Sequence, residues 1–277
     1  GLLLLLSTCL LLTGWIGARS YGLGSFLRFA APIGMIWIIG LVIFSPFYLG
    51  TAESQVQWPP LAPVEFGSRP VHFISIWLIL MTLFVPVVLL FAFKYLRVLT
   101  SKIKNMNPVP YSEANLIWRP AWVIALTLVI LPWISWAVTH MLFNHNAQFS
   151  DIIFRLPVTG SLGTVVVIMV AVTLTRSRRG ADDGAHYIMM MASVAIYLLF
   201  AAELFFVHDL FANRMNTVFK FYYQAWILLS VAGGYGAYVW LRQGPKLTGL
   251  MQAMNKSALI LVFILIASSI YFSVASS

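Results

Sequence analysis

The sequence is poor in charged residues and almost free of cysteine. Only 9% of its 277 residues are charged, whereas 61% are hydrophobic, including 20 Phe and 10 Trp. A soluble domain needs a more polar surface, so this composition excludes one. The single cysteine, Cys9, lies in an apolar run, and one cysteine excludes any disulfide within the chain.

Motifs for nucleotide and metal chemistry are also missing. The sequence contains no P-loop or other glycine-rich phosphate cradle, and no HExxH or CxxC spacing. Use of cytoplasmic ATP is therefore not indicated, and no standard zinc site is expected. The chain opens "GLLLLLSTCLLLTGWIGARS", without an initiator Met or the basic start of a signal peptide. We expect it to be the middle or end of a longer chain, with a cleaved signal peptide before residue 1 as the alternative.

Apolar runs of about 20 residues, enough to cross roughly 30 Å of hydrocarbon, recur along the sequence. They show no strict period-2 alternation, so the runs predict helices and not a β-barrel. Eight spans are predicted, near 1–17, 29–50, 74–96, 120–141, 161–175, 187–207, 218–241 and 257–275. The expected fold is all-α, a polytopic transmembrane helical bundle forming a single domain over residues 1–277.

Basic residues are distributed unevenly between the two sets of loops. One set holds 13 of the 17 Lys and Arg residues, and the other holds only Arg69, Arg155, Arg214 and Lys220. Because basic residues resist translocation, the richer side is predicted to be cytoplasmic, and both ends of the chain outside. We expect the plasma membrane of a prokaryote. The net charge of +9 then matches lipid headgroups and requires no nucleic acid partner.

Two predicted outer loops have local patterns of their own. In "NAQFSDIIFRLPV" apolar residues recur with helical spacing, with Asp151 and Arg155 as an i, i+4 pair away from them. This pattern predicts a short helix lying flat on the outer surface. In loop 51–73 four prolines exclude a continuous helix and favour extended structure. That loop is long enough to fold back over the outer mouth of the bundle and contact residues 208–217.

The stretch "HDLFANRMNTVFKFYYQAW", residues 208–226, concentrates scarce polar groups at the outer interface. Glu203 lies just before it inside an apolar run, where an ionisable group indicates a functional site unless it is only a structural pair. A Glu203–Lys220 or Asp209–Lys220 pair between adjacent helices would offset the cost of burial. Tyr223 shares a helical face with Lys220, and Tyr222 lies beside it, although tyrosines at this depth also serve as membrane-interface anchors.

The run "RMNTVFKFYYQAW", with its upstream Glu and Asp, resembles the signature of the uncharacterised YYY membrane proteins of bacteria and archaea. The resemblance covers about 40 residues, near 202–236, and the rest of the chain is similar only in its general character. It implies a fold-level relation to GT-C glycosyltransferases, which transfer a sugar from a polyprenyl-phosphate carrier outside the membrane. Matching positions include Glu203, Asp209, Arg214, Met215, Asn216, Thr217, Lys220, Tyr222, Tyr223 and Trp226. GT-C enzymes usually carry an acidic residue in the first outer loop near their true N-terminus, and we expect that segment to be missing from this chain.

These observations suggest roles for the candidate residues. Arg214 and Lys220 would neutralise the phosphate of a lipid-linked sugar donor, and Asp209 or Glu203 would act as general base. Asn216, Tyr222 and Tyr223 complete the expected substrate-binding set, and loop 51–73 would exclude water. The alternatives are a non-catalytic subunit of a membrane complex and a transporter, although no convincing internal repeat supports transport.

The histidines argue against haem. Four of them fall near the predicted outer boundary and one near the inner boundary, namely His72, His140, His145, His208 and His186. Two haems stacked across a bilayer need histidine pairs in the middle of spans, and none is present. No cofactor is expected. A divalent metal bound by an outer histidine with Asp209 or Glu203 is the alternative.

Overall fold

The structure is a computed structural model that describes residues 5–9, 11, 23–78, 80, 111–144, 148–175, 183–209 and 214–243, with single positions between 257 and 267. Its labelled elements are α2 (Leu23–Gln55), β1 (Val56–Pro63), α4 (Tyr111–Phe143), α5 (Phe149–Thr175), α6 (Asp183–Leu204), β2 (Phe205–Asp209) and α7 (Met215–Gln243). Two compact units are present, one comprising Gly1–Ser68 with Pro108–Trp226 and the other Arg69–Asn107 with Ile227–Ser277. The candidate site lies within the first unit.

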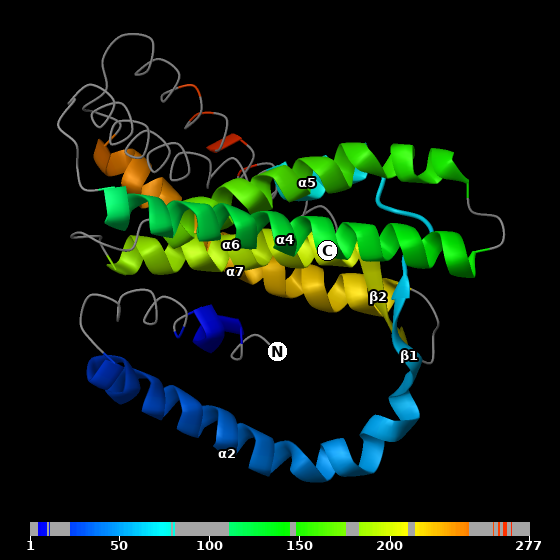
Figure 1. Cartoon of the computed structure of the whole chain (residues 1–277), viewed down its shortest axis with the longest axis horizontal. Helices are drawn as coiled ribbons and strands as arrows, with labels where there is room; N and C mark the ends of the chain where they lie inside the picture. Colours follow the sequence, from blue (N-terminus) through cyan, green and yellow to red (C-terminus); the bar gives the residue numbers. More distant parts are fainter. Residues whose placement is uncertain are drawn as a thin grey trace. The chain divides into compact units, whose positions relative to one another are not determined.

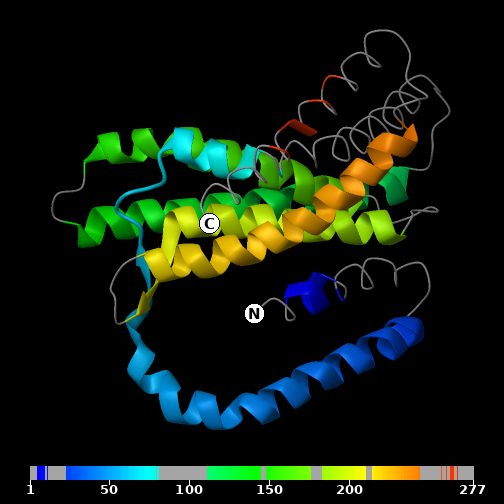
Figure 2. The same cartoon turned by 180° about the vertical axis from the view of Figure 1, so that it is seen from behind.

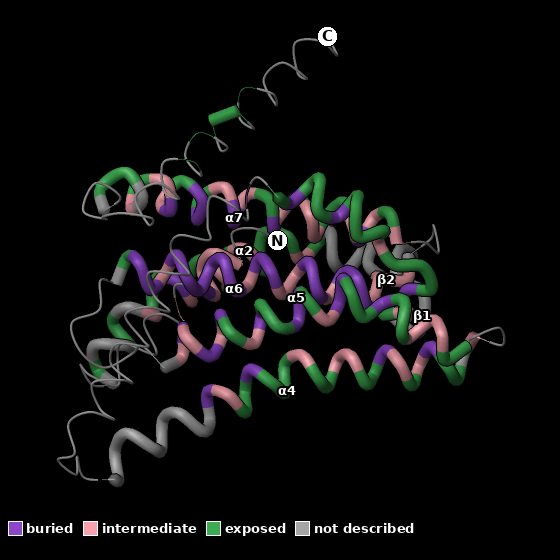
Figure 3. Tube along the Cα trace, turned by 90° about the horizontal axis from the view of Figure 1, so that it is seen from above, coloured by how far each residue is buried: buried purple, intermediate pink, exposed green. Residues whose placement is uncertain are grey.

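Helices α4, α5 and α6 form an antiparallel bundle in which α5 packs against both neighbours (Figures 1 and 2). Segments Ala121–Leu142, Phe149–Leu174 and Gly184–Leu204 are long and apolar enough to cross a membrane. Helix α6 is buried along most of its length, whereas α4 leaves much of its apolar surface exposed (Figure 3). Exposed apolar side chains suit contact with lipid, so this burial pattern agrees with a membrane bundle.

A glycine sets the close approach of α4 and α5. A Cβ atom on Gly163 would lie 2.8 Å from Val129 Cγ1 and 3.5 Å from Phe200 Cε2. Small residues permit such backbone approach in membrane helices, where lipid tails are as apolar as the side chains themselves. Gly163 therefore allows α5 to nest between α4 and α6.

Five predicted spans coincide with helices, and three of these helices meet the length and hydropathy expected of a span. Helix α2 contains a shorter apolar stretch, Ala30–Pro46. Helix α7 covers the predicted span 218–241 without a break. The predicted spans 1–17, 74–96 and 257–275 lie largely outside the described residues. The number eight therefore stays a prediction, as do the single domain and the orientation.

The predicted flat surface helix is wrong, because α5 runs without interruption from Phe149 to Thr175 and includes Pro157. Proline removes one backbone donor, but membrane helices tolerate that loss when neighbouring groups satisfy the freed carbonyl. The charge of Arg155 had suggested a segment at the membrane surface. Its side chain instead turns into the bundle and is buried.

Strands β1 and β2 form a two-stranded antiparallel sheet at one end of the bundle (Figure 1). Its register is Val56↔Asp209, Leu61↔Val207, Ala62↔Phe206 and Pro63↔Phe205. The irregularity falls between Val56 and Leu61, where two prolines lack the N–H group that a regular ladder needs. Extended structure in loop 51–73 is thus confirmed for 56–63, whereas α2 continues through Gln55 and residues 70–78 are helical.

Candidate functional site

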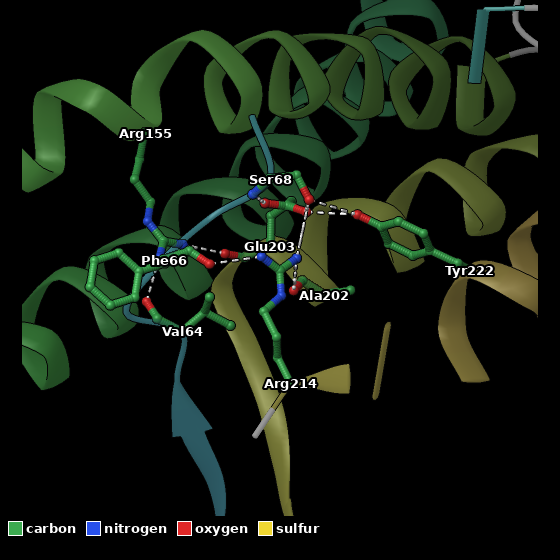
Figure 4. Close-up of polar contacts among 8 residues, drawn as sticks. All are labelled: Val64, Phe66, Ser68, Arg155, Ala202, Glu203, Arg214 and Tyr222. Atoms are coloured by element: carbon green, nitrogen blue, oxygen red, sulfur yellow. Dashed lines mark hydrogen bonds and ion pairs between the residues drawn. The ribbon is translucent and has the colours of Figure 1, made fainter. Parts of the chain in front are cut away.

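Glu203 is the centre of a buried polar cluster at the last turn of α6 (Figure 4). Its side chain is 1% exposed. Oε1 accepts hydrogen bonds from Ser68 Oγ, Arg214 Nη2 and Tyr222 Oη, each at 2.7 Å, and Oε2 accepts one from the Ser68 backbone N–H at 2.8 Å. A buried carboxylate needs such charge-assisted bonds to offset its desolvation.

Arg214, just before α7, links this carboxylate to the backbone after β1. Its Nη1 donates to the Phe66 carbonyl at 2.8 Å, while Nη2 forms the 2.7 Å ion pair with Glu203. Longer contacts of 3.4 Å join Nη2 to Ser68 Oγ and to the Ala202 carbonyl. The buried Nε atom has no hydrogen-bond partner among the described residues. Arg214 thus bridges two parts of the chain far apart in sequence.

Arg155 approaches the same backbone segment from α5. Its Nη1 donates to the Glu203 carbonyl at 2.5 Å, and its Nη2 to the Val64 carbonyl at 2.6 Å. The guanidinium also lies 4.7 Å from the centre of the Trp136 ring, a cation–π distance. Trp136 Nε1 donates to the same Val64 carbonyl at 3.1 Å. Two arginines and a tryptophan therefore hold residues 64–68, called the strap below.

Gly67 brings the strap backbone close to the cluster. A Cβ atom there would lie 3.2 Å from Glu203 Oε2 and 3.5 Å from Arg155 Cζ. The Val64 N–H also donates to the Leu204 carbonyl at 2.9 Å, which continues the β1–β2 pairing into the strap. In the segment "VEFGS", Val64 is buried, Gly67 lies close to Glu203, and Ser68 forms hydrogen bonds with Glu203.

The predicted site residues separate into two groups. Glu203, Arg214 and Tyr222 meet in the cluster, whereas Lys220 and Tyr223 are exposed on α7 and Asn216 is half-buried. Asp209 ends β2 opposite Val56. The predicted Glu203–Lys220 pair is wrong, because Arg214 occupies the place of the cation. Arg214 was expected to neutralise a donor phosphate, and its side chain, 19% exposed, pairs with the buried Glu203.

The expected contact between loop 51–73 and residues 208–217 is confirmed. The Arg214 side chain bonds to Phe66 and approaches Ser68, and Val56 pairs with Asp209 in the sheet. Whether this contact covers a substrate site stays a prediction, as do the roles given to the individual side chains.

A second polar pair lies beside the cluster. His140 Nε2 is 3.5 Å from Asp151 Oδ2, and the His140 ring stacks on Trp136 with 5.2 Å between centroids. Asp151 therefore contacts His140 and the Gln148 N–H, and the expected surface pair with Arg155 does not form. No group of three His, Cys, Asp or Glu side chains suitable for a metal occurs in the part of the chain that the structure describes.

Sequence reasoning overlooked Arg155, Ser68 and Trp136. A usable signal existed for Arg155, which is the only charged residue of α5 after Asp151. An ionisable side chain within an apolar span suggests a functional site, the same rule that selected Glu203. Ser68 and Trp136 carry no comparable signal, because their roles depend on contacts across 135 and 72 positions of sequence.

The bundle and its buried polar cluster define a helical integral membrane protein with a buried ion pair at the last turn of α6. The chain belongs to the uncharacterized membrane protein family DUF2298, whose family model matches residues 1–229. That range includes the strap, Glu203, Arg214 and Tyr222. No curated protein matches the chain, and no solved structure does.

Proposed function

We propose that this protein is a membrane-embedded glycosyltransferase-like enzyme that uses a polyprenyl-phosphate-linked sugar at the outer membrane face. The proposal follows the resemblance of residues 202–236 to the YYY membrane proteins and their relation to GT-C enzymes. The observation that carries it is the exposed face of α7 beside the Glu203 cluster. Tyr222 anchors the start of α7 to Glu203, while Lys220 and Tyr223 remain exposed.

The exposed face has the composition that a lipid phosphate requires. Met215, Phe219, Tyr223 and Trp226 recur at helical spacing, and all four are exposed. The exposed Lys220 lies at the edge of this stripe. Apolar and aromatic groups suit a lipid tail or a sugar ring, and an ammonium suits a phosphate. Lys220 is therefore assigned to the phosphate and Tyr223 to the sugar, with Asn216 as a further hydrogen-bonding group.

The hydrogen bonds of Glu203 count against it as the general base, so the proposal assigns that role to Asp209. Glu203 Oε1 already accepts three hydrogen bonds, so taking a proton there would require breaking at least one of them. Asp209 ends β2 on the same side of the bundle and close in sequence to Arg214. In this proposal Glu203 is a positioning residue, which holds α7 and the strap in place.

The test is transfer of a labelled sugar from a polyprenyl-phosphate donor by the full-length protein in proteoliposomes. Asp209→Asn should abolish transfer, and Lys220→Met should reduce it about tenfold or more by removing a charge-assisted bond, while Lys220→Arg should retain part of it. Arg242→Gln is the matched control, because Arg242 is exposed near the far end of α7 and contacts Tyr238. If the full-length protein transfers sugar from none of the polyprenyl-phosphate donors tested, the proposal is wrong.

A non-catalytic subunit of a membrane complex is the second candidate. The observation that favours it is the closed arrangement around Glu203, whose two oxygens are both engaged by donors from the strap and α7. A purely structural cluster would show this geometry. In that case Asp209→Asn and Lys220→Met should leave every function of the complex unchanged, whereas Arg214→Gln should disrupt its assembly.

A further inference from the structure

The strap is attached by polar contacts more than by apolar burial. Val64 is its only buried residue, at 1% exposure, and Phe66 is 83% exposed. Its other attachments are hydrogen bonds: the Val64 carbonyl accepts from Arg155 and Trp136, the Val64 N–H donates to the Leu204 carbonyl, the Phe66 carbonyl accepts from Arg214, and Ser68 donates to Glu203. Contacts of this kind are directional and are readily replaced by another group offering the same acceptors.

Of the two arginines that contact the strap, Arg155 and Arg214, only Arg214 forms an ion pair with a carboxylate among the described residues. Arg214 pairs with Glu203, but within the described residues Arg155 has no carboxylate at ion-pair distance. Arg155 instead donates to two backbone carbonyls, one of which belongs to the strap. A carbonyl carries no net charge, so it is a weaker partner for a buried guanidinium than an anionic oxygen.

If the strap moved away, arginine N–H donors would be exposed while the other hydrogen bonds of the Glu203 cluster stayed in place. Arg155 would keep its bond to the Glu203 carbonyl, and Glu203 would keep Arg214 and Tyr222. Lifting would also free Trp136 Nε1, and it would leave the Leu204 carbonyl and Glu203 Oε2 without the N–H groups of the strap. The guanidinium donors set free would be Arg155 Nη2 and Arg214 Nη1, next to an Arg214 Nε that has no partner among the described residues. These are N–H donors of two guanidinium groups, the geometry that phosphate oxygens favour.

We propose that the strap is a built-in competitor for a phosphate-binding site formed by Arg155 and Arg214. The carbonyl oxygens of Val64 and Phe66 hold the positions of phosphate oxygens, and the ligand binds when residues 64–68 lift away. The ligand class is a phosphate ester or diester. That the phosphate is the one carried by the lipid-linked donor, with Lys220 as a further contact, rests on the proposed function. The two-arginine site itself does not, since a free phosphate in water offers the same chemistry.

If the strap competes with phosphate, substitutions in the strap should raise the phosphate affinity, and substitutions of the arginines should lower it. Ser68→Ala removes the hydroxyl bond to Glu203 and weakens the closed strap, so the phosphate should bind more tightly, by up to about fivefold for one lost hydrogen bond. Gly67→Ala should act in the same direction, because its Cβ would lie 3.2 Å from Glu203 Oε2. Arg155→Gln removes a ligand donor and should weaken binding by about tenfold or more.

The experiment measures binding of a fluorescent polyprenyl phosphate to the full-length protein in nanodiscs of neutral lipid. Inorganic phosphate and diphosphate, added in water as competitors, distinguish a free anion from a lipid headgroup as the ligand. Ser68→Ala, Gly67→Ala, Arg155→Gln and Arg155→Lys are compared with Arg242→Gln, which should bind as the unmodified protein does. Comparable elution on size-exclusion chromatography establishes that each variant is folded.

The expected result is tighter binding by Ser68→Ala and Gly67→Ala, weaker binding by Arg155→Gln, and intermediate binding by Arg155→Lys. Weaker binding by both strap variants, or binding insensitive to Arg155, overturns the competing strap. If sugar transfer is seen at the same time, the proposed function stands and only this inference fails. If phosphate binds with the expected signs but no sugar is transferred, the inference stands and the enzyme proposal fails.

Discussion

Tyr222 Oη lies 2.7 Å from Glu203 Oε1, which ties the second turn of α7 to the last turn of α6. The two residues are 19 positions apart and lie before and after β2 in the sequence. Their bond therefore fixes the start of α7 against the end of α6. Because Thr217 also accepts the Val207 N–H at 2.8 Å, the start of α7 is held at two points. Lys220 and Tyr223 are consequently presented on a helix whose rotation is fixed.

Removing one partner of the Glu203–Arg214 pair should be costly. Arg214→Gln leaves a carboxylate that is 1% exposed without its cation, and we expect a loss of about 3–5 kcal/mol in the free energy of unfolding. Glu203→Gln together with Arg214→Gln should recover a large part of that loss, since no buried charge is then stranded. Unfolding of the purified variants in mixed detergent micelles measures both effects.

Lys220→Met is the matched control for this experiment, because Lys220 is exposed and Arg214 is the observed partner of Glu203. It should unfold as the unmodified protein does. A destabilised Lys220→Met that is rescued by Glu203→Gln would show that Lys220 pairs with Glu203, contrary to the structure.

Gly163→Ala should separate α4 from α5. The new methyl group would lie 2.8 Å from Val129 Cγ1, closer than such contacts allow, and overpacking of this kind costs about 1–3 kcal/mol. Val129→Ala on the same chain should restore stability by making room. Gly160→Ala is the control on the same helix, since nothing lies within 4 Å of its added Cβ. Thermal unfolding should rank Gly163→Ala well below Gly160→Ala, and equal values would contradict the close packing.

Trp136 contributes both a ring and a hydrogen bond to the site. Trp136→Phe keeps an aromatic face for Arg155 but removes the donor to the Val64 carbonyl and part of a fully buried ring, at an expected cost of about 1–3 kcal/mol. Trp136→Leu also removes the cation–π contact and should cost about 1 kcal/mol more. Denaturant unfolding, followed through a fluorophore placed away from the site, measures the difference. Similar values for the two variants would mean that the ring face contributes nothing.

Orientation can be tested by thiol labelling in a Cys9→Ala background. If the side with fewer basic residues is outside, Gln148→Cys should react with an impermeant reagent in intact cells. Arg178→Cys, in the basic sequence 176–179 that is predicted to be cytoplasmic, should react only after the cells are opened. The reverse pattern would place the Glu203 cluster at the cytoplasmic face.

The helices were predictable because an apolar segment of this length has few other ways to satisfy its backbone in a membrane. Glu203 was predictable as a site for the same reason, since an ionisable group in an apolar run is expensive. Its partner was not, because Arg214 and Lys220 are both cations near the start of α7. The choice between them depends on how β2 directs the chain after α6, which no local pattern encodes.

The strap was only partly predictable. The prolines of loop 51–73, which contains the strap, indicated extended structure, and the length of that loop indicated a return to the bundle. The partner strand had no such signal, because "FFVHD" continues the apolar run of α6 and was counted as part of a span. Pairing with β1 ends the helix at Leu204, so a long-range contact overrides local helix propensity there.

The pairing of strap and cluster also constrains the order of biosynthesis. Ser68 and Glu203 are 135 positions apart, so at about 5–20 residues per second the ribosome needs roughly 7–27 s to add the partner after the strap has emerged. During that interval the helices enter the membrane in the order of synthesis, so α5 with Arg155 is inserted before α6 with Glu203. A ribosome stall between residues 155 and 203 therefore leaves the Arg155 guanidinium without one of its two carbonyl acceptors, that of Glu203. We expect such truncated chains to be early targets for membrane quality-control proteases.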